Sequence, residues 1–299
     1  MDKIIEVRNL DKSYGKTQVL FNINLEVKRG ECLGVVGGNG AGKTTLLECI
    51  EGIKGWQKGD ILIEGLTIED DSRHLRRILG VQLQSSSLPN EIKVKEAAQL
   101  FAVEHDIDVE EKLYDELDVR RLLNKQYGQL STGQKRRLHL LLAILHDPDI
   151  IILDEPTAGL DVNSKYLLYT KINELKEKGK TILLTSHDMY EIENLCDRVL
   201  FINKGRIGKE LSAESLLEGD RHIIAISSQK NSLSQVDTMY AKLIEVKGRE
   251  VYFECSNINA CLKELLEHLT AQDDQIRDIY IKKKTVEGEL IKMMRGDEQ

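Results

Sequence analysis

Alternating polar and apolar residues mark the first part of the chain. Ile4–Val7 and Phe21–Val27 alternate in this way, and the alternation is broken at Tyr14–Gly15 and Arg29–Gly30. A period of two is typical of strands with one buried face, and glycine-containing breaks are typical of turns. The pattern predicts a small antiparallel β layer over residues 1–30.

Short, wholly apolar runs come next, and helical stretches separate them. Cys32–Val36 leads through a glycine-rich loop into a helical stretch from Lys43 to Ile50. Ile150–Leu153 and Thr181–Leu184 are two further apolar runs, with a helix-like stretch around Lys165–Lys178 between them. Apolar runs of this length are typical of strands covered on both faces, so the β-α-β alternation predicts an α/β fold with a largely parallel sheet.

Residues 92–146 have a different pattern. Apolar residues recur at helical spacing from Val94 to Phe101 and again from Leu138 to Leu145, without a convincing strand between them. This predicts a helical subdomain, at about 85–147, inserted into the α/β domain of residues 1–219.

The remaining residues, 220–299, have the pattern of a separate α+β domain. Four runs have strand character, one stretch is a short helix, and one long stretch has a single apolar helical face. Their order, βαββαβ, is that of the split, ferredoxin-like arrangement, followed by a terminal helix. The predicted strands are His222–Ile226, Leu243–Val246, Val251–Phe253 and Ile276–Ile281, and the predicted helices are at Ser232–Tyr240 and Ile258–Leu269.

Composition and charge restrict the possible functions. The chain has 299 residues and a formal net charge of −8, which does not favour free nucleic-acid binding, so no nucleic-acid partner is expected. Its five cysteines are scattered, and none is placed at metal-ligand spacing. The first five residues lack signal-peptide character, and no window reaches the ~18 to 20 apolar residues of a membrane span. We therefore expect a cytoplasmic protein.

A glycine-rich segment between the strand at Cys32–Val36 and the following helix fits the pattern G-x-x-x-x-G-K-[ST]. Its glycines allow backbone N–H groups to converge on phosphate oxygens at a helix N-terminus, where the helix dipole favours negative charge. Lys43 adds a positive charge for the β and γ phosphates, and Thr44 is an expected Mg²⁺ ligand. The predicted nucleotide-binding residues are Gly37, Gly38, Asn39, Gly40, Ala41, Gly42, Lys43, Thr44 and Thr45.

Two adjacent acids end the apolar run Ile150–Leu153. Asp154 is placed to hold magnesium, and Glu155, one residue further, can act as the general base that polarises the attacking water. Acids of a solvated loop seldom follow four consecutive apolar residues directly, so this pair indicates a catalytic site. Together with the glycine-rich loop, it predicts ATP and Mg²⁺ as cofactors.

Leu130–Gln134 has the sequence Leu-Ser-Thr-Gly-Gln and resembles the signature of the ATP-binding cassette family. Ser131 and Gly133 begin a predicted helix, so they can form a second anion site, and Gln134 completes the segment. In the family, this site binds the γ-phosphate held by the opposite subunit. The resemblance covers about residues 1–215 and implies an active ATPase that works as a dimer.

The resemblance also implies roles for other residues. Tyr14 is similar to the aromatic residue that stacks on adenine, and His187 is similar to the histidine that contacts the γ-phosphate. Gln84 is similar to the glutamine that contacts magnesium, with Gln82 as a close alternative. Ala158–Asp161 is similar to the loop that crosses the dimer interface. Two positions differ from the commonest family pattern, Gly38 and Thr132, and neither has to supply a side-chain ligand.

Two segments resemble the ABC-2 group of bacterial drug, antibiotic and lipid exporters. These are Leu79–Pro89 and the tail Ile276–Gly296, although Lys284 replaces an expected proline. The resemblance implies a separate multi-span membrane permease and a second ATPase subunit, which is either a copy of this chain or a homologue. It also implies a peripheral location on the inner face of the cell membrane.

Two other functions are considered. A soluble cassette ATPase acting on ribosomes or DNA usually carries two cassettes or a long coiled-coil insertion, whereas this chain has one phosphate loop and no long heptad run. A regulator that binds ATP without hydrolysing it would not need both Glu155 and His187. The exporter function is therefore preferred.

Overall fold

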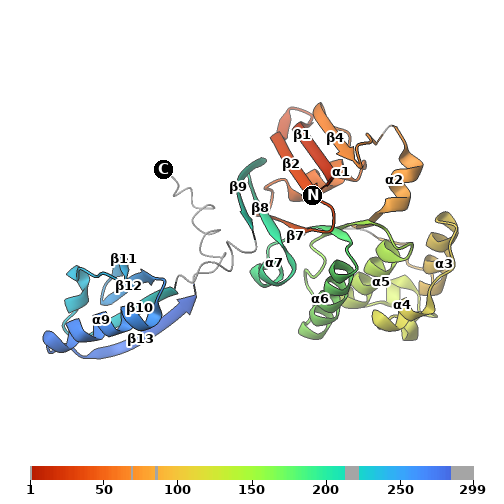
Figure 1. Ribbon diagram of the computed structural model, residues 1–299. Coiled ribbons are helices and arrows are strands. Elements are labelled where there is room, and N and C mark those ends of the chain that lie inside the picture. Colours follow the sequence, from red (N-terminus) through yellow and green to blue (C-terminus); the bar gives the residue numbers. More distant parts are fainter. Residues whose placement is uncertain (1, 69, 85–86, 213–221, 284–299) are drawn as a thin grey trace. The chain divides into compact units, whose positions relative to one another are not determined.

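The computed structural model describes residues 2–68, 70–84, 87–212 and 222–283, and the chain divides into two compact units (Figure 1). Unit 1 is Met1–Ser212 and unit 2 is Ala213–Gln299. The expected boundary between residues 219 and 220 falls within 213–221, which lie outside the described residues. Each unit is described separately below.

Unit 1 begins with the three-stranded antiparallel sheet that the alternating pattern predicts. Its strands are β1 (Lys3–Tyr14), β2 (Thr17–Lys28) and β4 (Lys58–Ile63), in the order β2-β1-β4. A single hydrophobic cluster joins this sheet to the rest of the unit, and it includes Ile5, Leu25, Leu46 and Leu183. The antiparallel layer therefore packs against the rest of unit 1 through this cluster.

The second sheet of unit 1 has six strands and is parallel except at one edge. Strand order is β5-β6-β7-β3-β8-β9, and only β8 and β9 pair antiparallel. All residues of β3, β6 and β7 are buried, which explains their continuous apolar runs. The strands are β3 (Cys32–Val36), β5 (Leu79–Gln82), β6 (Ile150–Asp154), β7 (Thr181–Ser186), β8 (Arg198–Asn203) and β9 (Arg206–Ser212).

Helices cover the six-stranded sheet on both faces. The cluster that joins the two sheets also contains side chains of α1 (Lys43–Ile50), so this helix lies on the side of the antiparallel layer. Figure 1 shows α6 (Val162–Glu177) and α7 (Met189–Leu195) on the opposite face. A short helix, α2 (Ser72–Ile78), leads into β5. This confirms the predicted α/β class with a covered parallel sheet.

The expected helical subdomain is present between β5 and β6. Its helices are α3 (Val94–Glu104), α4 (Glu111–Glu116) and α5 (Thr132–Ile144), with two 3₁₀ turns at Arg120–Leu122 and Tyr127–Gln129. Helix α5 packs closely on β5, because a Cβ atom added at Gly80 would lie only 2.0 Å from the carbonyl oxygen of Ala143. The glycine thus permits the close approach of this subdomain to the sheet.

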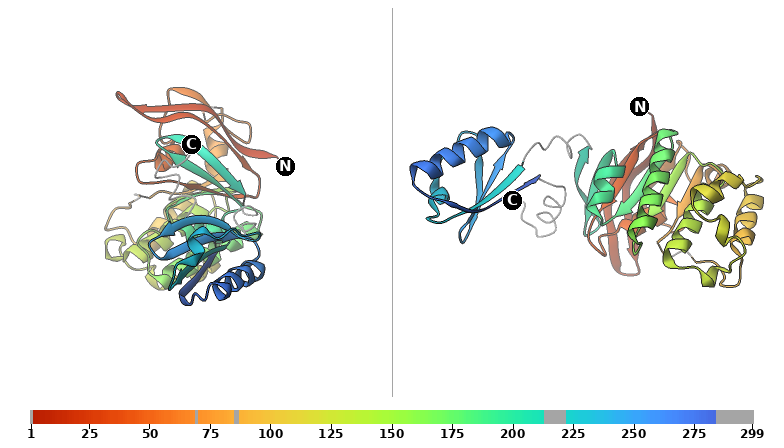
Figure 2. Two further views of the ribbon diagram at one scale, coloured as in Figure 1. Left: turned by 90° about the vertical axis from the view of Figure 1, so that its left-hand side faces the viewer. Right: turned by 90° about the horizontal axis from the view of Figure 1, so that it is seen from below.

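Over residues 222–283, unit 2 forms a four-stranded antiparallel sheet with one long helix, α9 (Ile258–Ala271), across one face (Figure 2). The strand order β11-β12-β10-β13 is that of the predicted split arrangement. Cys261, Leu265 and Leu269 of α9 are buried against the sheet. The strands are β10 (His222–Ser228), β11 (Lys242–Lys247), β12 (Glu250–Cys255) and β13 (Ile276–Lys283).

The prediction of a helix at Ser232–Tyr240, the first of unit 2, is wrong over most of its length. Only Ser232–Gln235 is helical, as a single 3₁₀ turn. The backbone N–H groups of Met239 and Tyr240 instead donate to the carboxylate of Glu264 on α9, at 2.7 and 3.1 Å. This tertiary contact satisfies the backbone without a helix, and local periodicity could not reveal it.

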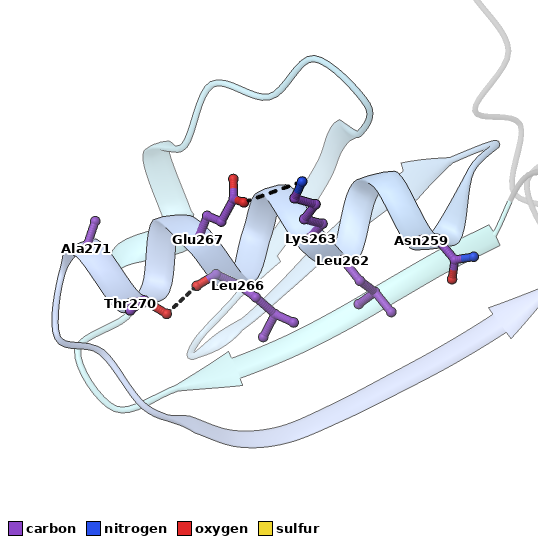
Figure 3. Close-up of a pocket in the computed structure, with 7 residues that line it drawn as sticks. All are labelled: Asn259, Leu262, Lys263, Leu266, Glu267, Thr270 and Ala271. Carbon is purple, nitrogen blue, oxygen red and sulfur yellow. Dashed lines mark hydrogen bonds and ion pairs between the residues drawn. The ribbon is translucent and has the colours of Figure 1, made fainter.

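A shallow pocket lies on the outer side of α9, where Figure 3 shows Leu262 and Leu266 pointing the same way. Leu266 is 44% exposed, whereas Leu262 is partly buried against the core of unit 2. The apolar face of α9 is therefore divided between core and surface. Within the described parts of both units, no helix is long and apolar enough to cross a membrane.

Candidate active site

The glycine-rich loop joins the end of β3 to the first turn of α1. Gly40 and Gly42 have φ angles of 76° and 108°, in the region that favours glycine. A Cβ atom at Gly37 would lie 2.3 Å from the carbonyl oxygen of Ile202, so the loop also packs tightly on the neighbouring strand β8. No side chain caps α1 and no acidic residue occupies its first turn. Its N-terminal N–H groups therefore suit an anion.

Lys43, the first residue of α1, folds back over this loop. Its Nζ atom donates to the carbonyl oxygens of Gly37 and Gly38, at 2.9 and 3.3 Å. The same atom lies 3.7 Å from Oε1 of Glu155, and the lysine is 6% exposed. The predicted phosphate-binding cation and the predicted base thus belong to one cluster, although 112 positions of sequence separate them.

Strand β6 delivers the two adjacent acids to this cluster. Asp154 is fully buried, and its Oδ1 atom accepts a hydrogen bond from the hydroxyl of Thr185 on β7. The backbone N–H of Glu155 donates to the same hydroxyl oxygen, at 3.0 Å. Glu155 has a φ of 47°, so the chain turns sharply where the strand ends. Thr185, which sequence reasoning missed, therefore holds both acids.

Gln84 and His187 converge on the carboxylate of Glu155. The side-chain nitrogen of Gln84 donates to Oε2 at 3.0 Å, and Nδ1 of His187 lies 3.5 Å from Oε1. Gln82, the alternative glutamine, is 1% exposed within β5, and its side-chain amide finds no hydrogen-bond partner among the described residues. Of the two glutamines, Gln84 reaches the acids.

The signature segment lies at the N-terminus of α5. Ser131 caps this helix by accepting from the backbone N–H of Gln134, at 3.3 Å, and the Gln134 side chain accepts from the N–H of Ser131, at 3.1 Å. A Cβ atom at Gly133 would be 2.9 Å from the hydroxyl of Ser164 and 3.8 Å from Oδ2 of Asp161. The signature segment and the loop ending at Asp161 are therefore neighbours.

These predicted residues form two clusters in unit 1. One contains Lys43, Gln84, Glu155 and His187, and the other contains the signature segment with Asp161. Between the described residues of the two clusters, no direct hydrogen bond or ion pair is formed.

Arg136 is a further charged residue near the acids that the sequence did not indicate. Its guanidinium donates to the carbonyl oxygen of Leu83, next to Gln84, at 3.3 Å. Burial lowers the pKa of Arg136, while the negative charges of Asp154 and Glu155 oppose that effect. The residue lies on α5, four positions after Thr132, so it links the signature helix to the loop that carries Gln84.

Tyr14 lies at the end of β1 and is 43% exposed. The ammonium group of Lys12 is 4.7 Å from the centre of its ring. One strand end thus presents an aromatic surface of the kind that stacks on a base. Of the remaining predicted nucleotide-binding residues, Asn39 and Ala41 lie in the glycine-rich loop, and Ala41 packs in the hydrophobic core cluster. Thr44 and Thr45 lie in the first turn of α1.

The residues present fit a magnesium ion. Oδ2 of Asp154 is buried and finds no hydrogen-bond partner in the described part of the chain, although a buried carboxylate oxygen normally has one. The amide oxygen of Gln84 is not used in its bond to Glu155, which involves the nitrogen. These atoms, with the hydroxyl of Thr44, are the oxygen donors that Mg²⁺ prefers.

Comparison with known proteins identifies similar sequences and folds. Residues 20–158 match the family model described as ABC transporter. The Nod factor export ATP-binding protein I of Burkholderia orbicola is 37% identical over 257 residues, covering 83% of this chain and 84% of that protein. The same-named protein of Rhizobium meliloti is 35% identical over 262 residues, covering 85% and 78%.

Solved structures agree with this result. One described as an ATP binding subunit of an ABC transporter has a TM-score of 0.67 at 28% identity, covering 72% of this chain and 92% of that chain. The cassette MJ0796, solved as a dimer, has a TM-score of 0.63 at 25% identity, covering 70% and 98%.

Proposed function

Because the chain belongs to the ABC transporter family of ATP-binding subunits, we propose that it hydrolyses MgATP at the Glu155 cluster to energise export through a separate membrane permease. The observation that supports this most strongly is the convergence of Lys43, Gln84 and His187 on the carboxylate of Glu155. A phosphate-binding cation, a base and its two neighbours thus occupy one site, as phosphoryl transfer to water requires.

The residues divide the chemical work between them. The N–H groups of the loop Gly37–Thr44 and the ammonium of Lys43 bind the phosphates, and Tyr14 stacks on the adenine. Thr44, Asp154 and Gln84 hold the magnesium ion, which neutralises phosphate charge when bound. Glu155 accepts the proton of the attacking water, and His187 orients the terminal phosphate. Positioning and charge stabilisation, without a covalent enzyme intermediate, account for the rate.

Each site is completed by a second subunit, either another copy of this chain or a homologous ATPase. The signature residues Ser131, Gly133 and Gln134, with Asp161, form an anion-binding region separate from the Glu155 cluster. In a head-to-tail pair, this region of one subunit faces the γ-phosphate bound by the other. The dimeric form of the related cassette MJ0796 supports this arrangement.

The exporter function rests on the relatives whose names describe Nod factor export. We propose a permease that carries a drug, an antibiotic or a lipid-like molecule, and a location on the inner face of the cell membrane. The cassette comprises residues 1–219, with its helical subdomain at about 85–147, and residues 220–299 form an accessory domain. The alternative, a soluble ATPase acting on ribosomes or DNA, has no supporting observation among the comparisons.

Hydrolysis of MgATP by the purified full-length chain tests the catalytic assignment. We expect Glu155→Gln to lower kcat by about 100-fold or more while ATP binding is kept, because the amide cannot accept the proton of water. Glu177→Gln, at an exposed position at the end of α6, is the matched control and should have the parental rate. Parental hydrolysis by Glu155→Gln would remove Glu155 as the base.

Affinity purification from native membranes in mild detergent tests the transport assignment. A stoichiometric multi-span membrane protein, identified by mass spectrometry, is the expected result. Recovery of ribosomal or other soluble partners alone, in detergent that preserves a control transporter, would support the soluble alternative instead.

A further inference from the structure

Glu191, in the first turn of α7, is a buried carboxylate that the proposed chemistry does not use. It is 2% exposed. Its Oε1 atom accepts a hydrogen bond from the hydroxyl of Thr157, and its Oε2 atom accepts one from the hydroxyl of Ser186. Both donors are themselves buried, at 1% and 2% exposure. One side chain therefore joins two segments that are far apart in the sequence.

The first of these segments is the turn that carries His187. The hydroxyl oxygen of Ser186 accepts from the backbone N–H of Asp188 at 2.9 Å, so this bond spans His187. A hydroxyl group has one proton to donate, and the Ser186 proton is used on Glu191. The lone pairs of Ser186 are thereby left for Asp188. Glu191 thus fixes the hydroxyl orientation that closes the turn around His187.

The second segment is the loop that carries Glu155. Thr157 follows Glu155 by two residues, and its hydroxyl proton is also donated to Glu191. The imidazole of His187 lies 3.5 Å from the Glu155 carboxylate. The carboxylate of Glu191 therefore connects the turn that carries His187 with the loop that carries Glu155. It does so through the hydroxyls of Ser186 and Thr157.

We propose that Glu191 is a positioning residue for ATP hydrolysis, which holds the turn of His187 in register with the loop of Glu155. The inference rests on the proposed function of that site. It assigns Glu191 no contact with the nucleotide. Its contribution is to keep the histidine in the orientation that the transferring phosphate requires.

The chemistry of the contact explains why a carboxylate occupies this position. Burying a carboxylate costs free energy, and burial accordingly raises the pKa of Glu191 while the two hydroxyl bonds oppose that effect. A purely structural position of this kind could be filled by an apolar residue at lower cost. A carboxylate accepts on both oxygens at once. The amide of a glutamine accepts on one atom only, so one of the two hydroxyls would have to reverse.

The test compares Glu191→Gln with two variants of its partner, in steady-state hydrolysis by the full chain. Glu191→Gln and Thr157→Val are expected to lower kcat by about 10- to 100-fold, with the KM for ATP within about twofold of the parent. Thr157→Ser keeps the hydroxyl and is the matched control, expected within about threefold of the parental kcat. Parental kcat in both Glu191→Gln and Thr157→Val would overturn the proposal. Thr157→Val provides the result if Glu191→Gln does not fold.

A double-mutant cycle then separates positioning of His187 from a general structural effect. Single-turnover hydrolysis of labelled ATP is measured in His187→Ala with and without Glu191→Gln. If Glu191 acts through His187, its replacement should change the remaining rate by less than about twofold. If Glu191→Gln lowers the hydrolysis rate by the same factor in the parent and in His187→Ala, the proposal is overturned. If Glu155→Gln and His187→Ala both have parental rates, the proposed catalytic site fails, which is a different result.

Discussion

The side-chain amide of Gln84 donates a 3.0 Å hydrogen bond to the carboxylate of Glu155, across 71 positions of sequence. This contact joins the loop after β5, which leads into the helical subdomain, to the end of β6, where the acids lie. Gln84 thus connects the loop that leads into the helical subdomain with the acids at the end of β6.

Gln84→Leu should lower turnover without lowering stability. Gln84 lies at an exposed position, so the substitution removes one hydrogen bond and buries no new polar group. We expect kcat to fall by about 10-fold or more, because the loss of one contact leaves Glu155 free to adopt unproductive orientations. Steady-state hydrolysis checks this, with the unfolding temperature as the control. A parental kcat would show that the contact has no role in turnover.

Gln82→Leu should raise stability and leave turnover unchanged. Gln82 is 1% exposed, and both polar atoms of its amide lack partners among the described residues. An apolar side chain of similar volume removes this cost, so the free energy of unfolding should rise by about 1 to 3 kcal/mol. Urea denaturation provides the measurement, and kcat should remain parental. A loss of activity without a gain in stability would instead favour Gln82, the alternative glutamine, as the residue that contacts magnesium.

Gly80→Ala should destabilise unit 1. The added methyl group would lie 2.0 Å from the carbonyl oxygen of Ala143 and 2.7 Å from Pro148, where backbone must move to admit it. We expect a loss of about 1 to 3 kcal/mol in the free energy of unfolding. Gly208→Ala is the matched control, because its nearest neighbour would be 3.9 Å away. Equal stabilities for the two variants would contradict the close packing of α5 on β5.

Gly133→Ala should weaken the ATP-dependent association of two chains. The methyl group would lie 2.9 Å from the hydroxyl of Ser164, which donates to Asp161 at 2.8 Å. Displacing this hydroxyl disturbs the loop that the proposed dimer shares. Light scattering of Glu155→Gln with bound MgATP measures dimer formation, and Ser164→Gly should partly restore it in the Gly133→Ala variant. An unchanged dimer fraction would place Gly133 outside the interface.

Acid should loosen the helical subdomain through His146. Burial, together with the smaller effect of the adjacent His105, whose ring stacks on it at a centroid distance of 3.8 Å, lowers the pKa of this imidazole from 6.5 to about 4. A histidine with a depressed pKa stabilises the fold fully above the unfolded value of 6.5 and loses that contribution as the pH falls towards 4. Hydrogen exchange of the ends of α3 and α5 should therefore increase over this range.

His146→Gln separates this titration from the general effect of acid. The glutamine retains a donor for the carbonyl oxygen of Leu79, which Nε2 of His146 contacts at 3.1 Å, but it does not titrate. Exchange at the ends of α3 and α5 should then depend less on pH between 6.5 and 4. His268→Gln, in unit 2, should leave the pH dependence of unit 1 unchanged. Equal pH profiles for the parent and His146→Gln would exclude His146 as the cause.

Features that depend only on neighbouring residues could be predicted from the sequence. The alternation in residues 1–30, the buried runs of β3, β6 and β7, and the glycine-rich segment before Lys43 each specify a local structure. The adjacent acids Asp154 and Glu155 follow directly from the end of an apolar strand. Because strand and helix periods are local properties, these elements and their chemistry could be predicted without knowledge of the packing.

Which distant residues meet depends on the packing of the whole fold. Gln82 and Gln84 are equivalent in a local pattern, yet β5 ends at Gln82 and the chain then turns, which brings Gln84 alone to Glu155. Thr185 and Glu191 carry no motif, and their importance comes from hydroxyl contacts between segments about 30 residues apart. Likewise, the Glu264 carboxylate accepts hydrogen bonds from the backbone N–H groups of Met239 and Tyr240, where a helix was expected. Hydrogen bonds to buried groups depend on which elements the fold places side by side, and a local sequence pattern contains no information about that choice.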